Sequence, residues 1–92
     1  MQLTIDDAIT VNDAVVFKEI DGEAVLLDLQ RGTYFGLDII ATRVWQTLVE
    51  QGCARPVLAP LLDEFDVAPD ILEHDITRLL ADLSATDLIR RR

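Results

Sequence analysis

Residues 23–38 read EAVLLDLQRGTYFGLD, and within this stretch the apolar pattern changes from that of strands to that of a helix. Residues 23–29 are rich in strand-forming side chains, residues 30–32 predict a turn, and residues 33–37 predict a short aromatic strand. Asp38 predicts the N-cap of a helix, because its carboxylate can accept a hydrogen bond from a backbone N–H of the first turn. The stretch therefore predicts two strands that lead directly into a helix.

Another strand is expected before this stretch. Residues 14–20 read AVVFKEI, and Asp21-Gly22 follows as a two-residue hairpin signal, since both residues tolerate the positive φ that such a turn requires. Residues 1–12 are less regular and predict either a short strand or an arm along the edge of the sheet. Their apolar side chains are Leu3, Ile5, Ile9 and Val11.

Three helices are expected after Asp38. The first ends at Gly52, a suitable C-terminal stop, and the second begins near Pro56. The third begins near Asp70, which can form a capping box with Glu73, or takes Pro69 as its first helical residue. Its apolar stripe is Leu72, Ile76, Leu79, Leu80 and Leu83. A short strand is expected at residues 88–89. The predicted order is thus a β-hairpin, a third strand and three helices, which is an α+β fold.

The length and net charge of the chain limit the functions that it can have. Ninety-two residues allow one small domain, and eight basic against 17 acidic residues leave a net charge of −9. Such an acidic surface repels nucleic-acid phosphates and anionic membranes. The single cysteine excludes an intramolecular disulfide and a cysteine-based zinc site. No signal peptide, transit peptide or membrane-spanning run is recognised, so we expect a cytoplasmic protein.

The chain offers little for catalysis. His74 and Ser84, each the only residue of its type, lie ten positions apart on one predicted helix, about 15 Å along its axis. Cys53 follows a helix-stop glycine and is expected to be a small buried or half-buried side chain. The carboxylates at positions 63, 64 and 66 lack the spacing of a calcium loop, and no glycine-rich phosphate loop is present. We therefore expect a protein that is not an enzyme and holds no metal or cofactor.

Two surfaces remain as candidate binding sites. If the strand at residues 33–37 lies at the edge of the sheet, its unpaired backbone groups can recruit an extended peptide as an added strand. A groove between this strand and the third helix would place Asp75 and its apolar neighbours beside the peptide. That groove would suit a peptide with hydrophobic anchors and a basic residue. Ordinary coverage of the core by Tyr34 and Phe35, and a solvated helix face around Asp75, are the simpler alternatives.

The ordered set of these motifs resembles the PqqD-like family of precursor-peptide recognition elements. The similarity covers residues 12–90 and includes the Leu-Leu-Asp strand at residues 26–28, the turn glycine Gly32 and the Trp-x-x-Leu helix motif at residues 45–48. It is strongest to the stand-alone leader-binding proteins of lasso-peptide clusters, which share Trp45 and the Gly-x-Tyr turn. Asp38 replaces the more usual asparagine and keeps its capping role.

The resemblance implies a winged-helix-like fold with a three-stranded antiparallel sheet packed on three helices. It implies that the domain spans residues 13–90, between an N-terminal arm or short strand at 1–12 and a basic tail at 91–92. Family members bind the leader of a ribosomal precursor peptide as a strand and present it to a leader peptidase or a radical SAM enzyme. The peptide-binding residues carried over by position are Thr33, Tyr34, Phe35, Leu72, Asp75, Ile76, Leu79 and Leu83.

Other functions stay open at this stage. One is a peptide chaperone of the type used in PQQ biosynthesis, acting with a radical SAM enzyme. Another is a small dimerisation module, in which the edge strand pairs with its own copy and gives a weak dimer in place of a monomer. A winged-helix DNA binder is disfavoured, because Glu73, Asp75 and Asp82 outnumber Arg78 on the helix that would enter the major groove.

Overall fold

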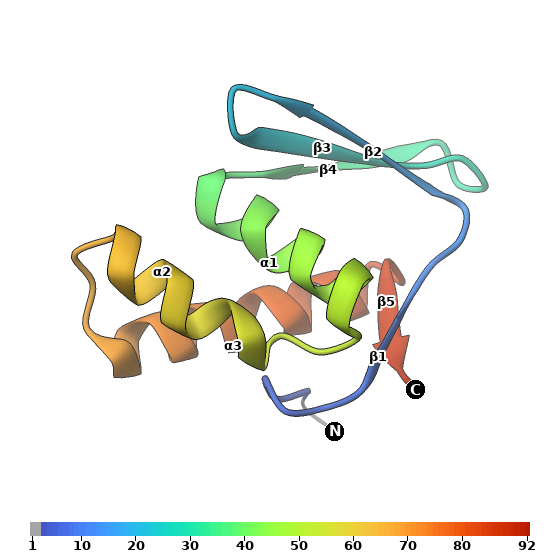
Figure 1. Cartoon of the computed structure of the whole chain (residues 1–92). Coiled ribbons are helices and arrows are strands. Elements are labelled where there is room, and N and C mark those ends of the chain that lie inside the picture. Colours follow the sequence, from blue (N-terminus) through green and yellow to red (C-terminus); the bar gives the residue numbers. More distant parts are fainter. Residues whose placement is uncertain (1–2) are drawn as a thin grey trace.

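The computed structural model describes residues 3–92 and has a sheet layer above a helical layer, with a second small sheet at one side (Figure 1). The elements are β1 (Ile9–Val11), β2 (Val15–Ile20), β3 (Glu23–Asp28), β4 (Thr33–Leu37), α1 (Ile39–Gln51), the 3-10 helix η1 (Arg55–Val57), α2 (Leu58–Glu64), α3 (Pro69–Ala85) and β5 (Ile89–Arg91). The expected α+β, winged-helix-like order of three antiparallel strands followed by three helices is confirmed.

The main sheet has the strand order β2-β3-β4, with both pairs antiparallel. Asp21 and Gly22 connect β2 to β3 with φ angles of 54° and 85°, as the hairpin signal predicted. Gly32 has a φ of 69° in the turn between β3 and β4. The residues with positive φ at each turn are therefore aspartate and glycine, which adopt this conformation at low cost.

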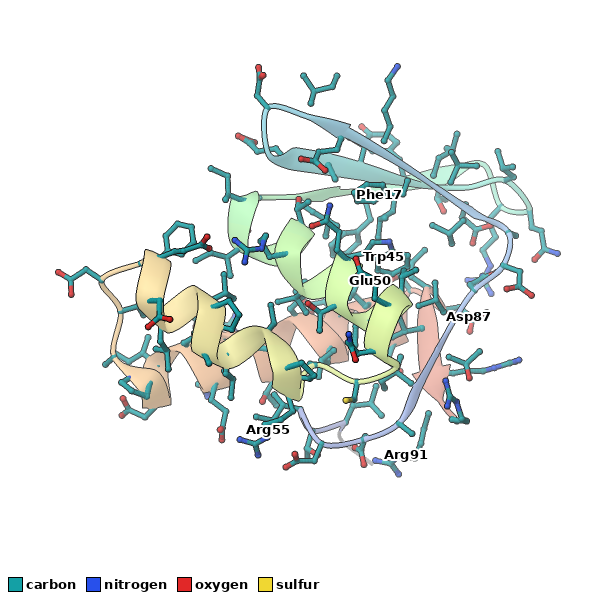
Figure 2. The ribbon with its side chains drawn as sticks, viewed as in Figure 1. Phe17, Trp45, Glu50, Arg55, Asp87 and Arg91 are labelled. Atoms are coloured by element: carbon teal, nitrogen blue, oxygen red, sulfur yellow. The ribbon has the colours of Figure 1, made fainter. Side chains whose placement is uncertain are left out.

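The sheet buries one face only. Along β3, Ala24, Leu26 and Asp28 are buried, while Val25 and Leu27 point away from the helices and are exposed. This alternation follows from the two-residue period of a strand. Trp45 of α1 and Phe17 of β2 lie between the helix and the inner face of the sheet (Figure 2).

Helix α1 has the two caps that the sequence predicted. The Asp38 carboxylate accepts a hydrogen bond of 2.8 Å from the backbone N–H of Ala41, and Gly52 ends the helix in the left-handed conformation with a φ of 75°. Arg43 of α1 forms an ion pair with Glu64 of α2. The start of α1 is therefore set by Asp38, directly after the last residue of β4.

Two helix starts differ from the simplest prediction. The segment near Pro56 begins as η1 and continues as α2 from Leu58. For α3 the capping box of Asp70 and Glu73 is wrong, because Ala68 is the N-cap and makes no side-chain hydrogen bond. Pro69 takes the first helical position, which was the stated alternative and suits a residue without an N–H.

The two ends of the described chain lie side by side (Figure 1). Within the segment predicted as a short strand or an arm, residues 1–2 lie outside the described residues. Ile9–Val11 form β1, which pairs antiparallel with β5 and not with the main sheet. Two exposed ion pairs hold the segment before β1, one between Arg55 and Asp6 and one between Arg91 and Asp7. The hydrogen bonds from Arg55 lower the pKa of Asp6, so this contribution to stability is present above an ordinary aspartate pKa and lost as the pH falls through the lowered pKa.

We predict that Leu26→Ala lowers the free energy of unfolding by about 2–5 kcal/mol, because Leu26 is fully buried at the centre of the sheet. The matched control is Leu27→Ala, the same truncation one residue further along β3. Leu27 is 39% exposed on the outer face, so we expect a much smaller loss. Chemical denaturation of both variants tests this, and equal losses would contradict the assignment of the two faces.

Candidate functional site

The edge of the main sheet at β4 is open. Strand β4 pairs with β3 on one side, and no strand of residues 3–92 pairs with it on the other. A strand in this position presents a row of backbone N–H and C=O groups that lack a ladder partner. The condition for strand addition that the sequence analysis set is therefore met.

The three predicted strand residues of the site differ in their orientation. Tyr34 is 77% exposed and lies on the outer face, where its partner in the register is Leu27 of β3. Phe35 is half-buried and packs against the core, and Thr33 is exposed at the start of the strand. The edge thus offers an exposed aromatic ring on one face and an aromatic side chain anchored in the core on the other.

A depression of about 320 Å³ lies beside the first half of β4. Arg31, Thr33, Tyr34 and Phe35 line it from the strand side. The end of α3 and the residues after it supply the other wall, through Ala85, Thr86 and Leu88. The predicted strand residues are therefore brought together with the C-terminal end of α3.

A second depression, of about 250 Å³, lies between the start of α1 and the first half of α3. Its lining is apolar except for Asp38 and Asp75. The apolar lining residues are Ile40, Ala41, Val44, Val67, Leu72, Ile76 and Leu79. Asp75 is exposed, and its carboxylate forms no hydrogen bond or ion pair within residues 3–92. The second depression therefore combines an apolar floor with one unpaired carboxylate and one that caps a helix.

Four of the five predicted helix residues, Leu72, Asp75, Ile76 and Leu79, line the second depression. Leu83 is fully buried in the core and lines neither depression. The contribution of α1 to the second depression was not predicted from the sequence, although the N-cap signal at Asp38 already placed the start of this helix at the end of β4. Arg31 and Thr86, which line the first depression, were not predicted either, because no motif marks them.

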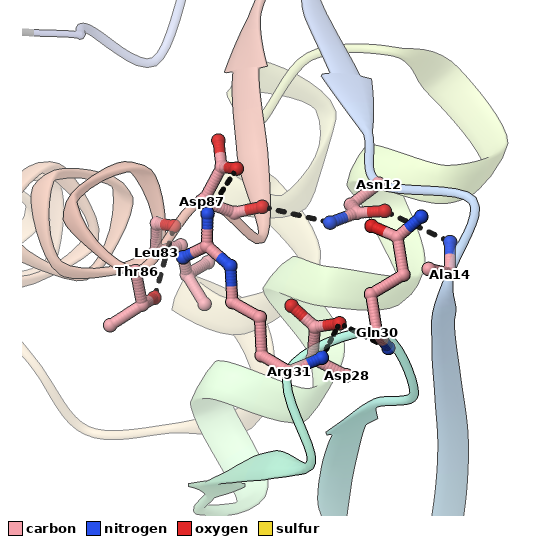
Figure 3. Close-up of polar contacts among 8 residues, drawn as sticks. All are labelled: Asn12, Ala14, Asp28, Gln30, Arg31, Leu83, Thr86 and Asp87. Carbon is pink, nitrogen blue, oxygen red and sulfur yellow. Dashed lines mark hydrogen bonds and ion pairs between the residues drawn. The ribbon is translucent and has the colours of Figure 1, made fainter.

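Polar contacts hold the turn before β4 against the end of α3 (Figure 3). The buried Asp28 carboxylate accepts hydrogen bonds from the backbone N–H groups of Gln30 and Arg31, at 3.0 and 3.3 Å. The Arg31 guanidinium in turn pairs with Asp87 at 2.9 Å. Since both partners are more than half exposed, this ion pair contributes little to stability by itself. It links the two walls of the first depression.

His74 and Ser84, which were considered for catalysis, both lie on α3, and Cys53 follows α1. His74 is exposed and Cys53 is half-buried. Within the part of the chain that the structure describes, no three His, Cys, Asp or Glu side chains are placed to share a metal ion. None of the helices formed by residues 3–92 has the length and apolar character needed to cross a bilayer.

The geometry is that of a winged-helix-like domain with an open edge strand beside a helix, and the comparisons with known proteins agree. The model of the PqqD family, described as coenzyme PQQ synthesis protein D, matches residues 23–89. The chain therefore belongs to the PqqD family, and the resemblance seen in the sequence is confirmed. A comparison with curated proteins gave no match.

Two solved structures share the fold. The first, described as TbiB1 in complex with the TbiA(beta) leader peptide, is 38% identical and has a TM-score of 0.78. The match covers 87% of this chain and 93% of that one. The second, a lasso peptide synthetase B1 complexed with the leader peptide, is 24% identical with a TM-score of 0.80, covering 90% of this chain and 98% of that one. At this identity the second structure supports the fold alone.

We predict that Tyr34→Ala changes the free energy of unfolding by no more than about 0.5 kcal/mol, because the ring is largely exposed. Phe35→Ala, the neighbouring truncation on the inner face, should cost clearly more, since Phe35 packs against the core. Thermal or chemical denaturation measures both. A large loss for Tyr34→Ala would show that Tyr34 is a structural residue.

Proposed function

We propose that this chain captures the leader of a ribosomal precursor peptide as a strand added to β4, in the groove formed with α3. The observation that carries the proposal is the open edge of β4 between two depressions that α3 lines. Family membership and the 38% identical TbiB1, described in complex with a leader peptide, support the choice of a leader among all extended peptides. The peptide-binding residues in this proposal are Thr33, Tyr34, Phe35, Leu72, Asp75, Ile76, Leu79 and Leu83, the last as support beneath the groove.

In strand addition, affinity and specificity come from different groups of the protein. Backbone hydrogen bonds to β4 would bind any extended peptide, whereas the depressions on either side select particular side chains. The apolar floor around Leu72, Ile76 and Leu79 favours a hydrophobic anchor. Asp38 and Asp75 at its rim favour a basic residue next to that anchor, because opposite charges attract and the rest of the surface is also acidic.

The captured leader would then be presented to a separate enzyme in the cytoplasm, with this chain contributing no catalysis. A leader peptidase of lasso-peptide biosynthesis is the proposed partner, and a radical SAM enzyme of a PQQ-type pathway is the alternative. No cofactor is needed for the proposed role. The chain would act as a monomer or weak dimer, and it would not bind nucleic acid, because α3 has an acidic exposed surface at Asp70, Glu73, Asp75 and Asp82.

Hydrogen exchange tests strand addition directly. We predict that a bound leader increases the protection of backbone amides in residues 33–36, because outward-facing amides of β4 gain hydrogen-bond partners. Amides of α3 should change less, since they are already paired within the helix. The probes are the leader of a short precursor encoded beside this chain and the TbiA(beta) leader peptide.

The same samples supply the control for catalysis, as the precursor should be recovered intact after incubation with this chain alone. Protection confined to α1 or α2, with residues 33–36 unchanged, would contradict strand addition even if the peptide binds. Binding of neither leader would contradict the proposed function. A concentration series by analytical ultracentrifugation, with and without leader, separates peptide capture from self-pairing of the edge strand.

A charge reversal tests the second depression. We predict that Asp75→Arg weakens leader binding at least about fivefold, which corresponds to about 1 kcal/mol. The matched control is Asp82→Arg, the same exposed charge reversal on the same helix, outside both depressions. Isothermal titration calorimetry should show a larger loss for Asp75→Arg, with melting temperatures of both variants close to the wild type. Equal losses would place the effect in the overall charge of α3.

A further inference from the structure

We propose that Gly36 leaves a hole on the outer face of β4 that receives a bulky apolar side chain, preferably aromatic, from the leader strand. The inference rests on the proposed function and adds a second recognition surface. The depressions beside α3 would contact side chains on the inner face of the added strand, whereas the space above Gly36 would receive a side chain on its outer face.

The register places Gly36 on the outer face. Gly36 pairs with Val25 of β3, and Tyr34 pairs with Leu27, so Tyr34 and Gly36 are the two residues of β4 that point away from the helices. Val25 is 45% exposed, although it belongs to the central strand. A side chain at position 36 would cover part of Val25, and the glycine leaves it open.

The backbone does not require glycine at this position. Unlike Gly22, Gly32 and Gly52, Gly36 does not have a positive φ. A Cβ atom built on Gly36 has no heavy atom within 4 Å among residues 3–92 other than those of Gly36 and its two chain neighbours, so neither strain nor crowding excludes a side chain. Glycine within a strand weakens it and commonly marks a place that another group approaches closely. The space that a side chain at position 36 would occupy is therefore open in this structure.

The space is part of an open depression of about 570 Å³ whose lining includes Ile20, Val25 and Gly36. Ile20 is 64% exposed and Val25 45%, so the surface around Gly36 is apolar. Lys18, Asp21, Glu23 and Asp38 also line the depression. An apolar surface bordered by charged groups suits an apolar side chain better than a charged one.

An added strand would place one residue directly opposite Gly36, on the same face. Directly opposed residues in antiparallel strands have Cβ atoms about 4.5–5.5 Å apart, and large side chains reach across the neighbouring position. Opposite a glycine, such a side chain can lie over the bare backbone and contact the next strand, which is the basis of aromatic rescue of glycine. Here it would contact Val25, and the exposed Tyr34 ring would flank it two residues along β4.

Filling the hole tests the proposal. We predict that Gly36→Val weakens leader binding at least fivefold, with Gly36→Ala intermediate, while the melting temperature stays equal or rises because valine favours strands. The matched control is Val16→Ile, which also enlarges a side chain on the outer face but lies on β2, at the far edge of the sheet and outside this depression, and should bind like the wild type. Affinities are measured by titration calorimetry with the leaders named above.

An alanine scan of the leader identifies the matching residue. One bulky apolar position should lose affinity on truncation with wild-type protein and lose much less with Gly36→Val, since the hole is already filled. Equal or tighter binding by Gly36→Val would overturn the inference, because it would show only the gain expected from a better strand former. If residues 33–36 still gain hydrogen-exchange protection with wild-type protein, the proposed function stands without the inference. If Gly36→Val does not weaken binding and residues 33–36 of the wild-type protein also gain no protection, the proposed function is contradicted as well.

Discussion

The structure depends on the direct connection from β4 into α1. Asp38 caps the helix one residue after the strand ends, so the chain leaves the sheet at once, and no further strand within residues 3–92 pairs with β4. The same capped helix packs beneath the inner face of the sheet and supplies Val44, Trp45 and Leu48 to the core. One local hydrogen bond thus helps to set the core and the open edge, and it places α1 as a wall of the second depression.

A domain of this size has little surface, and the two faces and the open edge of its main sheet differ in their exposed groups. The inner face of the sheet is used for the core, because a small protein needs nearly all of its buried apolar area for stability. The open edge supplies backbone groups, the ends of α3 supply walls, and the outer face keeps exposed apolar side chains around Gly36. The unpaired backbone groups of the β4 edge are therefore groups that the fold does not use in its own sheet.

Local chemistry predicted most of the fold. The Asp21-Gly22 turn, the Asp38 and Gly52 caps and the apolar stripe of α3 were readable because each depends on residues close together in the chain. The predicted capping box at Asp70 was wrong because the sequence allows two starts for α3. The helix begins at Pro69, with Ala68 as its N-cap. The pairing of β1 with β5 was not foreseen, since it joins segments that are far apart in the sequence.

By itself the sequence determined the order of elements, the short aromatic strand with Tyr34 and Phe35, and the helix that carries Asp75, because period, turn chemistry and family motifs are local properties. The tertiary structure decided that this strand lies at an open edge of the sheet. Only the tertiary structure decided which side chains share a depression. It placed Leu83 in the core although it lies on the same stripe as Leu79, since a helix face is wider than the part that borders the groove. It also brought Arg31 against Asp87 and left open space above Gly36, because distances across a fold depend on how layers pack and not on neighbouring residues.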